Sequence, residues 1–386
     1  MTRPVYLDYN ATTPVDPQVQ ATIAEVLQET FGNPSSSHVY GQQARAVIER
    51  GRQQVADLIQ AQTSEIVFTA SASEANNLAI LGTACARQAQ GRHLITSAVE
   101  HPSVLQPFNY LQQQGWELTV LPVDEFGRVD PGDLEQAIRP DTVLVSIMHA
   151  NNEVGTIQPI EAIAAITRQH GIPLHVDAAQ SAGKIPVEVN ALGADLLTLA
   201  GHKFYAPKGI GALYIKEGIH PNPILFGAAQ ERGQRTGTEN VPYIAGLGVA
   251  AQLARAQLDH DATALRNKRN RLHHALLDAI PDLTLNGHPD QRLPNTLNVS
   301  FPGVEGKSLL EKASDRIAAS TGSACHADSD EVSGVLGAMG IDVQRAVGAV
   351  RLSVGRPTPD AEIDSAATAL IDAWQACLSA GRTGSR

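Results

Sequence analysis

Cysteine is scarce in this sequence, and the three that occur, Cys85, Cys325 and Cys377, form no pairing pattern. An odd and sparse set argues against a disulfide framework and fits a reducing compartment. The lack of a Cys-x-x-Cys or His-rich cluster gives no sign of a structural zinc site, so we expect no metal. No apolar run approaches the ~20 residues that span a bilayer, and the N-terminus lacks a signal-peptide core. These absences predict a cytoplasmic protein with no membrane partner.

Positively charged residues are also few. The 29 Lys and Arg residues are outnumbered by 40 Asp and Glu residues, so the formal net charge is −11. Phosphate backbones bind clustered Lys and Arg, so nucleic acid is not an expected partner. Aromatic residues make up only 4% of the chain, but hydrophobic residues make up 43%. A chain of 386 residues with that content is expected to fold as a large domain plus a smaller one.

Short apolar runs alternate with amphipathic helical stretches over the first 240 residues. This order predicts a mainly parallel α/β sheet with helices on both faces, and a ligand site beyond the carboxyl ends of its strands. After residue 240 a long helical stretch, 244–279, leads into short strands at 297–300 and 350–353. We predict a large domain over 15–255 and a smaller C-terminal α/β domain over 256–386, joined by the N-terminal segment 1–14. The strands expected in the first part cover residues 65–69, 93–97, 117–121, 142–147, 173–177, 196–199 and 211–215.

Two side chains follow predicted strands and suit cofactor chemistry. Lys203 stands in a Gly-His-Lys turn, where a desolvated amine could form a Schiff base with an aldehyde, although a solvated loop lysine fits the same pattern. Asp177 ends a strand, where a carboxylate could pair with a protonated pyridine nitrogen or simply cap a helix.

Two further positions suggest anion binding and thiol chemistry. Ser73 opens an expected helix over 73–88, whose N-terminus could bind phosphate, although an ordinary cap explains the serine better when it is taken alone. Cys325 lies in a small, polar stretch typical of an exposed loop, where a thiolate could act as a nucleophile, with His326 next to it as a candidate base. Cys85 and Cys377 lie in helical patterns and are expected in the core.

Seven segments together resemble the cysteine desulfurases, which belong to the class V aminotransferase group and have the fold type I architecture of pyridoxal-phosphate enzymes. The resemblance runs from about Pro4 to Trp374, and its specificity comes from all segments occurring in order. The segments are YLDYNATTP at 6–14, FGNPSS at 31–36, EH at 100–101, HANNEVG at 149–155, HVDAAQ at 175–180, GHK at 201–203 and AC at 324–325.

The resemblance implies a role for each matching residue. Pyridoxal 5'-phosphate is the implied cofactor, with Lys203 as its Schiff-base lysine and Cys325 as the sulfur-accepting, catalytic cysteine. The implied cofactor contacts are Asp177 at the pyridine nitrogen, His101 stacked on the ring and moving protons, Gln180 at the ring hydroxyl, Ala72, Ser73 and His202 at the phosphate, and Thr238 reaching the phosphate of a partner subunit. Asn152 and Arg351 would hold the substrate carboxylate, a task that suits the two-pronged arginine side chain. Asn152 is also implied as a contact of the cofactor.

Two departures separate this chain from the family pattern. Ala200 replaces a common serine and so removes one hydroxyl donor from the phosphate site. Ala228 and Ala229 add two methyl groups where the family pattern is rich in glycine.

The implied function is release of sulfur from L-cysteine, giving L-alanine and a persulfide on Cys325 for iron–sulfur cluster or thio-cofactor synthesis. The implied partners are L-cysteine, a sulfur-acceptor or scaffold protein, and a second copy of the chain in a homodimer. Cys325 could also serve as a transient iron–sulfur ligand. An ordinary aminotransferase and a weakly active scaffold in iron–sulfur assembly stay open. A selenocysteine lyase acting on L-selenocysteine also stays open, because further segments are similar to those enzymes, at 223–227, 292–296, 324–326 and 351–356.

Overall fold

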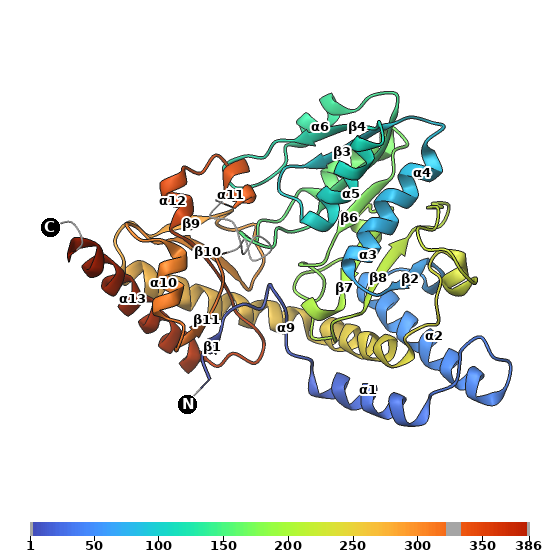
Figure 1. The fold of residues 1–386 in the computed structure, drawn as a ribbon, viewed down its shortest axis with the longest axis horizontal. Helices are drawn as coiled ribbons and strands as arrows, with labels where there is room; N and C mark the ends of the chain where they lie inside the picture. The colour runs from blue at the N-terminus through green and yellow to red at the C-terminus, as the bar shows by residue number, and fades with distance from the viewer. Residues whose placement is uncertain (1–2, 322–332, 384–386) are drawn as a thin grey trace.

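A seven-stranded mixed sheet forms the centre of the larger part of the molecule (Figure 1). The computed structural model describes residues 3–321 and 333–383. Five neighbouring strands, β4, β3, β5, β6 and β7, run parallel, and β8 lies antiparallel between β7 and β2, which confirms the predicted mainly parallel α/β sheet. In spatial order the strands are β2 (Ile66–Thr69), β8 (Gly211–Ile215), β7 (Leu196–Ala200), β6 (Leu174–Asp177), β5 (Thr142–Met148), β3 (His93–Ser97) and β4 (Glu117–Leu121).

Helices cover both faces of this sheet because alternate residues of its strands point to opposite sides. In β2, Ile66 and Phe68 join one hydrophobic core, while Val67 between them joins another. The first core also takes residues from α1, α2, α6, α7, α8 and α9, and the second from α3, α4 and α5. These helices are α1 (Pro17–Glu29), α2 (Val39–Ile59), α3 (Ala72–Asn77), α4 (Thr83–Arg87), α5 (Pro102–Gln113), α6 (Pro131–Ala137), α7 (Ile160–Gln169), α8 (Val189–Leu192) and α9 (Val241–Ala279).

The C-terminal part has its own core around a three-stranded antiparallel sheet in the order β12-β10-β9. The N-terminal strand β1 pairs in parallel with β11, so the start of the chain lies beside this part. The predicted boundary at residue 255 stays a prediction. The elements of this part are β1 (Val5–Tyr6), β9 (Thr284–Asn286), β10 (Thr296–Ser300), β11 (Ile317–Ala318), β12 (Ala349–Ser353), α10 (Gly306–Lys312), α11 (Gly334–Ala338), α12 (Val343–Val347) and α13 (Asp360–Thr383).

Helix α9 connects the two parts of the molecule and runs beneath both of them in Figure 1. Its first turns place Val241, Ile244 and Leu247 in the core of the large sheet. Further along, Leu272 and Leu276 pack into the C-terminal core. No helix in the described ranges is both long enough and apolar enough to cross a membrane.

The helix expected over 73–88 differs from the prediction. It begins at Ala72, and Ser71 caps it by accepting a hydrogen bond from the Glu74 amide. A π-helical turn over Leu78–Gly82 interrupts it. The wider turn shifts the phase of the residues after it, and Cys85 is exposed rather than in the core as expected. Cys377 on α13 is only half-buried, so the prediction that it lies in the core was also wrong.

Candidate active site

A cavity of about 270 Å³ opens where β5, β6 and β7 end. This is the edge of a parallel sheet at which ligands bind, and the volume is close to the lower end of the range for small-molecule sites, roughly 300 Å³. The structure brings nearly all the predicted site residues of the described ranges to its walls. These are Ala72, Ser73, His101, Asn152, Asp177, Gln180, His202, Lys203 and Arg351.

Lys203 enters the cavity from the connection between β7 and β8. It ends a 3₁₀ turn that starts at Gly201, where a Cβ atom would lie 2.9 Å from the carbonyl oxygen of Ile210. Its Nζ donates hydrogen bonds to the carbonyl oxygens of Asn10, at 2.6 Å, and Ala11, at 2.9 Å. The lysine is therefore held by backbone rather than solvated as a surface side chain.

Asp177 is the last residue of β6 and is buried, with 5% of its surface exposed. One carboxylate oxygen accepts a hydrogen bond from the Asn76 side chain at 2.8 Å, and the other accepts one from the Ala179 amide at 2.9 Å. The second contact closes a turn, so Asp177 does not cap a helix. Within residues 3–321 and 333–383, the side-chain oxygen of Asn76 is buried and has no hydrogen-bond partner.

His101 caps α5 and lines the cavity. Its Nδ1 accepts a hydrogen bond from the Ser103 amide at 3.1 Å and lies 2.8 Å from the Ser103 hydroxyl. An Nδ1 that accepts leaves Nε2 to carry the proton of the neutral ring. Burial lowers the pKa of His101 and nearby Lys203 lowers it too, while Asp177 acts in the opposite direction. The geometry favours a neutral imidazole whose Nε2–H is available as a donor.

Gln180 and His202 line the cavity on either side of Lys203. The Gln180 Nε2 donates to the carbonyl oxygen of Asn10 at 3.0 Å. His202 Nδ1 lies 3.1 Å from the Thr12 hydroxyl, and burial and neighbouring lysines lower the pKa of His202 to about 4. Residues 10–12 thus connect three of the predicted cofactor contacts.

Ser71, Ala72 and Ser73 form the start of α3 and also line the cavity. The free N–H groups at a helix start attract anions. Ala200 lines the same cavity and adds no hydroxyl to it. This wall of the cavity is suited to a phosphate. Ser71 adds a further hydroxyl here, to which the sequence patterns had assigned no role.

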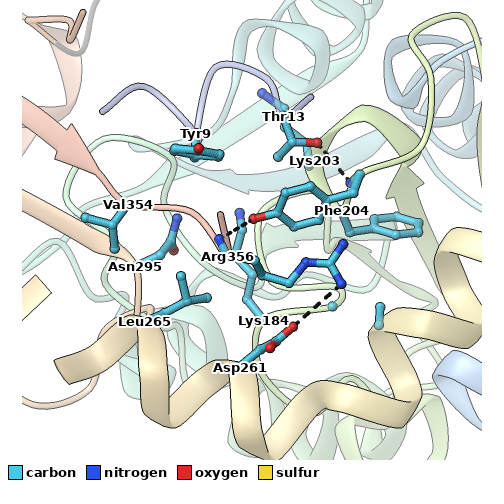
Figure 2. Close-up of a pocket in the computed structure, with 13 residues that line it drawn as sticks. Tyr9, Thr13, Lys184, Lys203, Phe204, Asp261, Leu265, Asn295, Val354 and Arg356 are labelled. Atoms are coloured by element: carbon cyan, nitrogen blue, oxygen red, sulfur yellow. Dashed lines mark hydrogen bonds and ion pairs between the residues drawn. The ribbon is translucent and has the colours of Figure 1, made fainter. Parts of the chain in front are cut away.

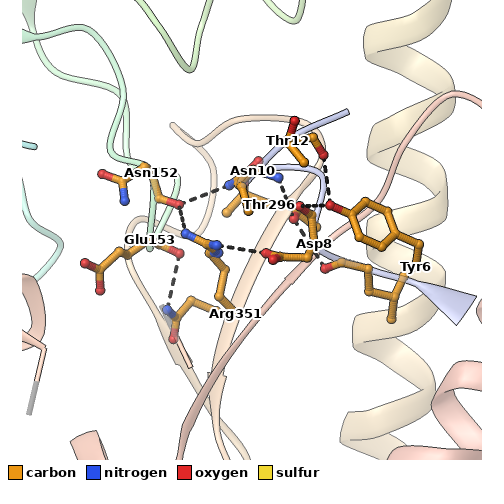
Figure 3. A network of polar contacts seen from close by, with 12 residues as sticks. Tyr6, Asp8, Asn10, Thr12, Asn152, Glu153, Thr296 and Arg351 are labelled. Atoms are coloured by element: carbon orange, nitrogen blue, oxygen red, sulfur yellow. Dashed lines mark hydrogen bonds and ion pairs between the residues drawn. The ribbon is translucent and has the colours of Figure 1, made fainter. Parts of the chain in front are cut away.

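Arg351 approaches the cavity from β12 and is almost fully buried (Figure 3). Its Nη2 forms an ion pair with the Asp8 carboxylate at 2.8 Å, and its Nη1 donates to the carbonyl oxygen of Asn152 at 3.1 Å. Its Nε is buried and bonds to no described residue. The predicted carboxylate-binding arginine thus already faces one carboxylate, that of Asp8.

One predicted position lies away from this group, and two fall outside the described residues. Thr238 is exposed and lines a different pocket with Phe31 and Asn240, so within one chain it does not reach the cavity. Cys325 and His326 lie outside the described residues.

Three contacts escaped the sequence patterns, namely the carbonyl of Asn10 against Lys203, the Asn76 amide against Asp177, and Asp8 against Arg351. Asp8 and Asn10 lie within the YLDYNATTP segment, so the signal for them was present. Asn76 carries no comparable signal, because an asparagine one turn into a helix has many roles.

An amine, a buried carboxylate and a helix start thus share one cavity. They suit a ligand that carries an aldehyde, a basic ring nitrogen and a phosphate. Pyridoxal phosphate has these three groups, and the residues present fit it.

Comparison with known proteins agrees with this site. The model of the aminotransferase class-V family matches residues 5–365. A protein described as cysteine desulfurase IscS from Dictyoglomus turgidum is 46% identical over 94% of this chain and 93% of its own length. Another of that description, from Methanosarcina thermophila, is 47% identical over 93% of this chain and 89% of its own length.

Solved structures are also similar over nearly the whole chain. A structure described as a NifS-like protein has a TM-score of 0.90 and 37% identity, covering 96% of this chain and 99% of its own. One described as SspA in complex with cysteine has a TM-score of 0.81 and 38% identity, covering 91% of this chain and 98% of its own. The chain therefore belongs to the class-V aminotransferase family and, within it, to the pyridoxal-phosphate-dependent cysteine desulfurases.

Proposed function

We propose that this chain removes sulfur from L-cysteine at the cavity around Lys203, releasing L-alanine and leaving the sulfur on Cys325 as a persulfide. The observation that carries the proposal is the placement of the Lys203 amine and the buried Asp177 carboxylate in one cavity of about 270 Å³.

Residues from several elements would hold the cofactor. Lys203 would bind its aldehyde carbon, Asp177 would pair with its ring nitrogen, and His101 would lie against its ring. Gln180 would bond to its ring hydroxyl, while Ala72, Ser73 and His202 would contact its phosphate together with Thr238 of a second copy. When bound, pyridoxal phosphate supplies a carbonyl that takes the substrate amine and a ring that withdraws electrons from the substrate Cα.

Substrate is oriented by its carboxylate. Arg351 offers its guanidinium group to that carboxylate, and Asn152 lies beside it on the cavity wall. The unpartnered Nε of Arg351 supports this role, because a buried N–H without an acceptor favours a ligand that brings one.

Protons and sulfur are moved by three side chains. Lys203 Nζ takes the proton from the substrate Cα, and the neutral ring of His101 presents its Nε2–H to the reacting groups as a hydrogen-bond donor. The Cys325 thiolate attacks the substrate sulfur; the S–S bond forms, the Cβ–S bond breaks, and its electrons and a proton give alanine. The persulfide then passes to an acceptor or scaffold protein for iron–sulfur clusters or thio-cofactors, in the cytoplasm.

A second copy of the chain fits the position of Thr238. Thr238 lines a pocket with Leu27 and Phe31. Phe31 is 73% exposed and stacks on the half-exposed Tyr40 at 5.3 Å between ring centroids. Large exposed apolar side chains grouped together favour a protein interface, which supports the homodimer.

The test separates cofactor chemistry from sulfur transfer. Wild type should turn yellow with pyridoxal phosphate and release alanine from L-cysteine. Lys203→Ala should lose both the covalently bound chromophore and turnover. Cys325→Ala should keep the chromophore and lose persulfide formation, whereas Cys85→Ala, at the exposed cysteine, should behave as wild type.

Two results would contradict the proposal: turnover by Lys203→Ala, or normal persulfide formation by Cys325→Ala. L-selenocysteine is assayed beside L-cysteine with wild type and Cys325→Ala. Preferred use of the selenium substrate, unaffected by loss of Cys325, would favour a selenocysteine lyase.

A further inference from the structure

Lys184 is a buried lysine to which the proposed function gives no role. Only 6% of its surface is exposed, and among the described residues no carboxylate forms an ion pair with it. Burying an ammonium group without a counter-ion is costly, so a lysine kept in such a place calls for an explanation.

Lys184 lies close to Lys203, the active-site lysine. Figure 2 shows Lys184 among the residues that line a small cavity, of about 10 Å³, which also touches Lys203. That volume has room for about one water molecule. Lys203 borders both this small cavity and the main one, so Lys184 lies directly behind the active site.

Both hydrogen bonds of the Lys184 ammonium group go to one residue, Gln180. Its Nζ donates to the Oε1 of Gln180 at 3.0 Å and to the Gln180 carbonyl oxygen at 3.0 Å. An ammonium group can only donate, so it fixes Oε1 as the atom that faces Lys184. The Gln180 Nε2 must then face the other way, where it donates to the Asn10 carbonyl that also binds Lys203.

We propose that Lys184 is a positioning residue whose ammonium group holds the Gln180 amide in the orientation that donates into the Lys203 cavity. The inference rests on the proposed function, in which Gln180 donates to the ring hydroxyl of the cofactor. Without Lys184 only the Asn10 carbonyl fixes the amide orientation. The flipped orientation, in which Oε1 faces the cofactor oxygen and repels it, therefore becomes more populated.

The charges around Lys184 make this orientation sensitive to pH. Burial lowers the pKa of Lys184 to about 7, and nearby Lys203 and Arg351 act in the same direction. His202 also interacts with Lys184, while Asp261 and Arg356 line the small cavity with it. A neutral amine both donates and accepts, so the orientation is held most firmly below that pKa.

The experiment uses the full-length holoenzyme and a cycle of variants at positions 184 and 180. We compare wild type, Lys184→Met, Gln180→Ala and the double variant by pyridoxal-phosphate affinity and by the pH midpoint of the bound cofactor's visible absorption. Lys184→Met should weaken cofactor binding about tenfold, the order expected for one hydrogen bond, and should shift the midpoint. In the Gln180→Ala background the same change should have no further effect, because the group that Lys184 positions is gone.

Three controls make the outcome decisive. Lys307→Met removes an exposed positive charge and should leave both readouts unchanged. Lys184→Gln replaces Lys184→Met if the latter does not fold, and it should show the same midpoint shift, because an amide cannot fix the Gln180 orientation. Wild type must first bind the cofactor; failure there would count against the proposed function itself.

Equal effects of Lys184→Met in both backgrounds would overturn the inference, since Lys184 would then act by charge alone. Unchanged affinity and midpoint in a folded Lys184 variant would overturn it as well.

Discussion

Replacing Asp8 by asparagine should tighten substrate binding and weaken the fold at the same time. Asp8 lies 2.8 Å from Arg351 Nη2, and the exposed side-chain fractions are 20% for Asp8 and 4% for Arg351. A substrate carboxylate bound to Arg351 would share that guanidinium group with the Asp8 carboxylate. Asp8→Asn keeps the hydrogen-bonding shape but removes the competing charge.

The magnitude follows from the contact itself. A hydrogen bond between charged groups contributes about 1 kcal/mol more than a neutral one, so the free energy of unfolding should fall by about 1 kcal/mol. Two carboxylates about 6 Å apart repel by roughly 3 kcal/mol at an effective dielectric constant of 20. Relief of half that repulsion corresponds to about a tenfold lower dissociation constant for the amino acid.

The assay measures both quantities on the same protein. Affinity comes from spectral titration of the holoenzyme with L-alanine, the product, and from the KM for L-cysteine; stability comes from urea denaturation. Asp372→Asn, which breaks an exposed ion pair with Arg316, is the matched control and should change neither. A weaker affinity in Asp8→Asn would refute the reasoning, because Asp8 would then orient Arg351 for the substrate instead of competing with it.

Two further predictions concern buried carboxyl groups. Glu231 forms an ion pair with Arg52 at 2.7 Å, and both side chains are at most 5% exposed. Glu231→Gln should therefore lower the free energy of unfolding in denaturant by about 3 kcal/mol, because it leaves the buried arginine without a counter-charge. If the double variant Glu231→Gln/Arg52→Met recovers none of this stability, the loss does not come from the uncompensated arginine. Burial raises the pKa of Glu100 from 4.5 to about 8, with Asp177 adding to the rise, so its folded form keeps a proton that the unfolded chain loses. As pH rises from about 4.5 to 8, the free energy of unfolding of wild type should therefore fall relative to that of Glu100→Gln. The slope should be at most about 1.4 kcal/mol per pH unit. Parallel curves of unfolding free energy against pH for the two proteins would contradict this.

Much of the fold could be read from the sequence because the strands of the sheet are short apolar runs between helical patterns. The strand expected at 93–97 matches β3, for example, and the end of β6 at Asp177 is where the sequence placed it. The phase of the helix after β2 could not be read, since the π-helical turn over Leu78–Gly82 depends on packing and not on local propensity. For the same reason Cys85 was assigned to the wrong face.

The site was predictable where a residue type carries chemistry and less so where it positions another. Lys203 and Arg351 were recognised as reactive or charged groups near strands, and the resemblance to cysteine desulfurases gave them roles. Asn76 and Asp8 act through contacts between segments 101 and 343 residues apart in sequence. Such contacts arise only when the chain folds, and one sequence holds no record of them.

Helix α9, at 39 residues, extends about 58 Å if straight. The first core of the large sheet and the C-terminal core both take side chains from this one helix, so unwinding it would open both cores. Heat should therefore unfold the molecule in one transition.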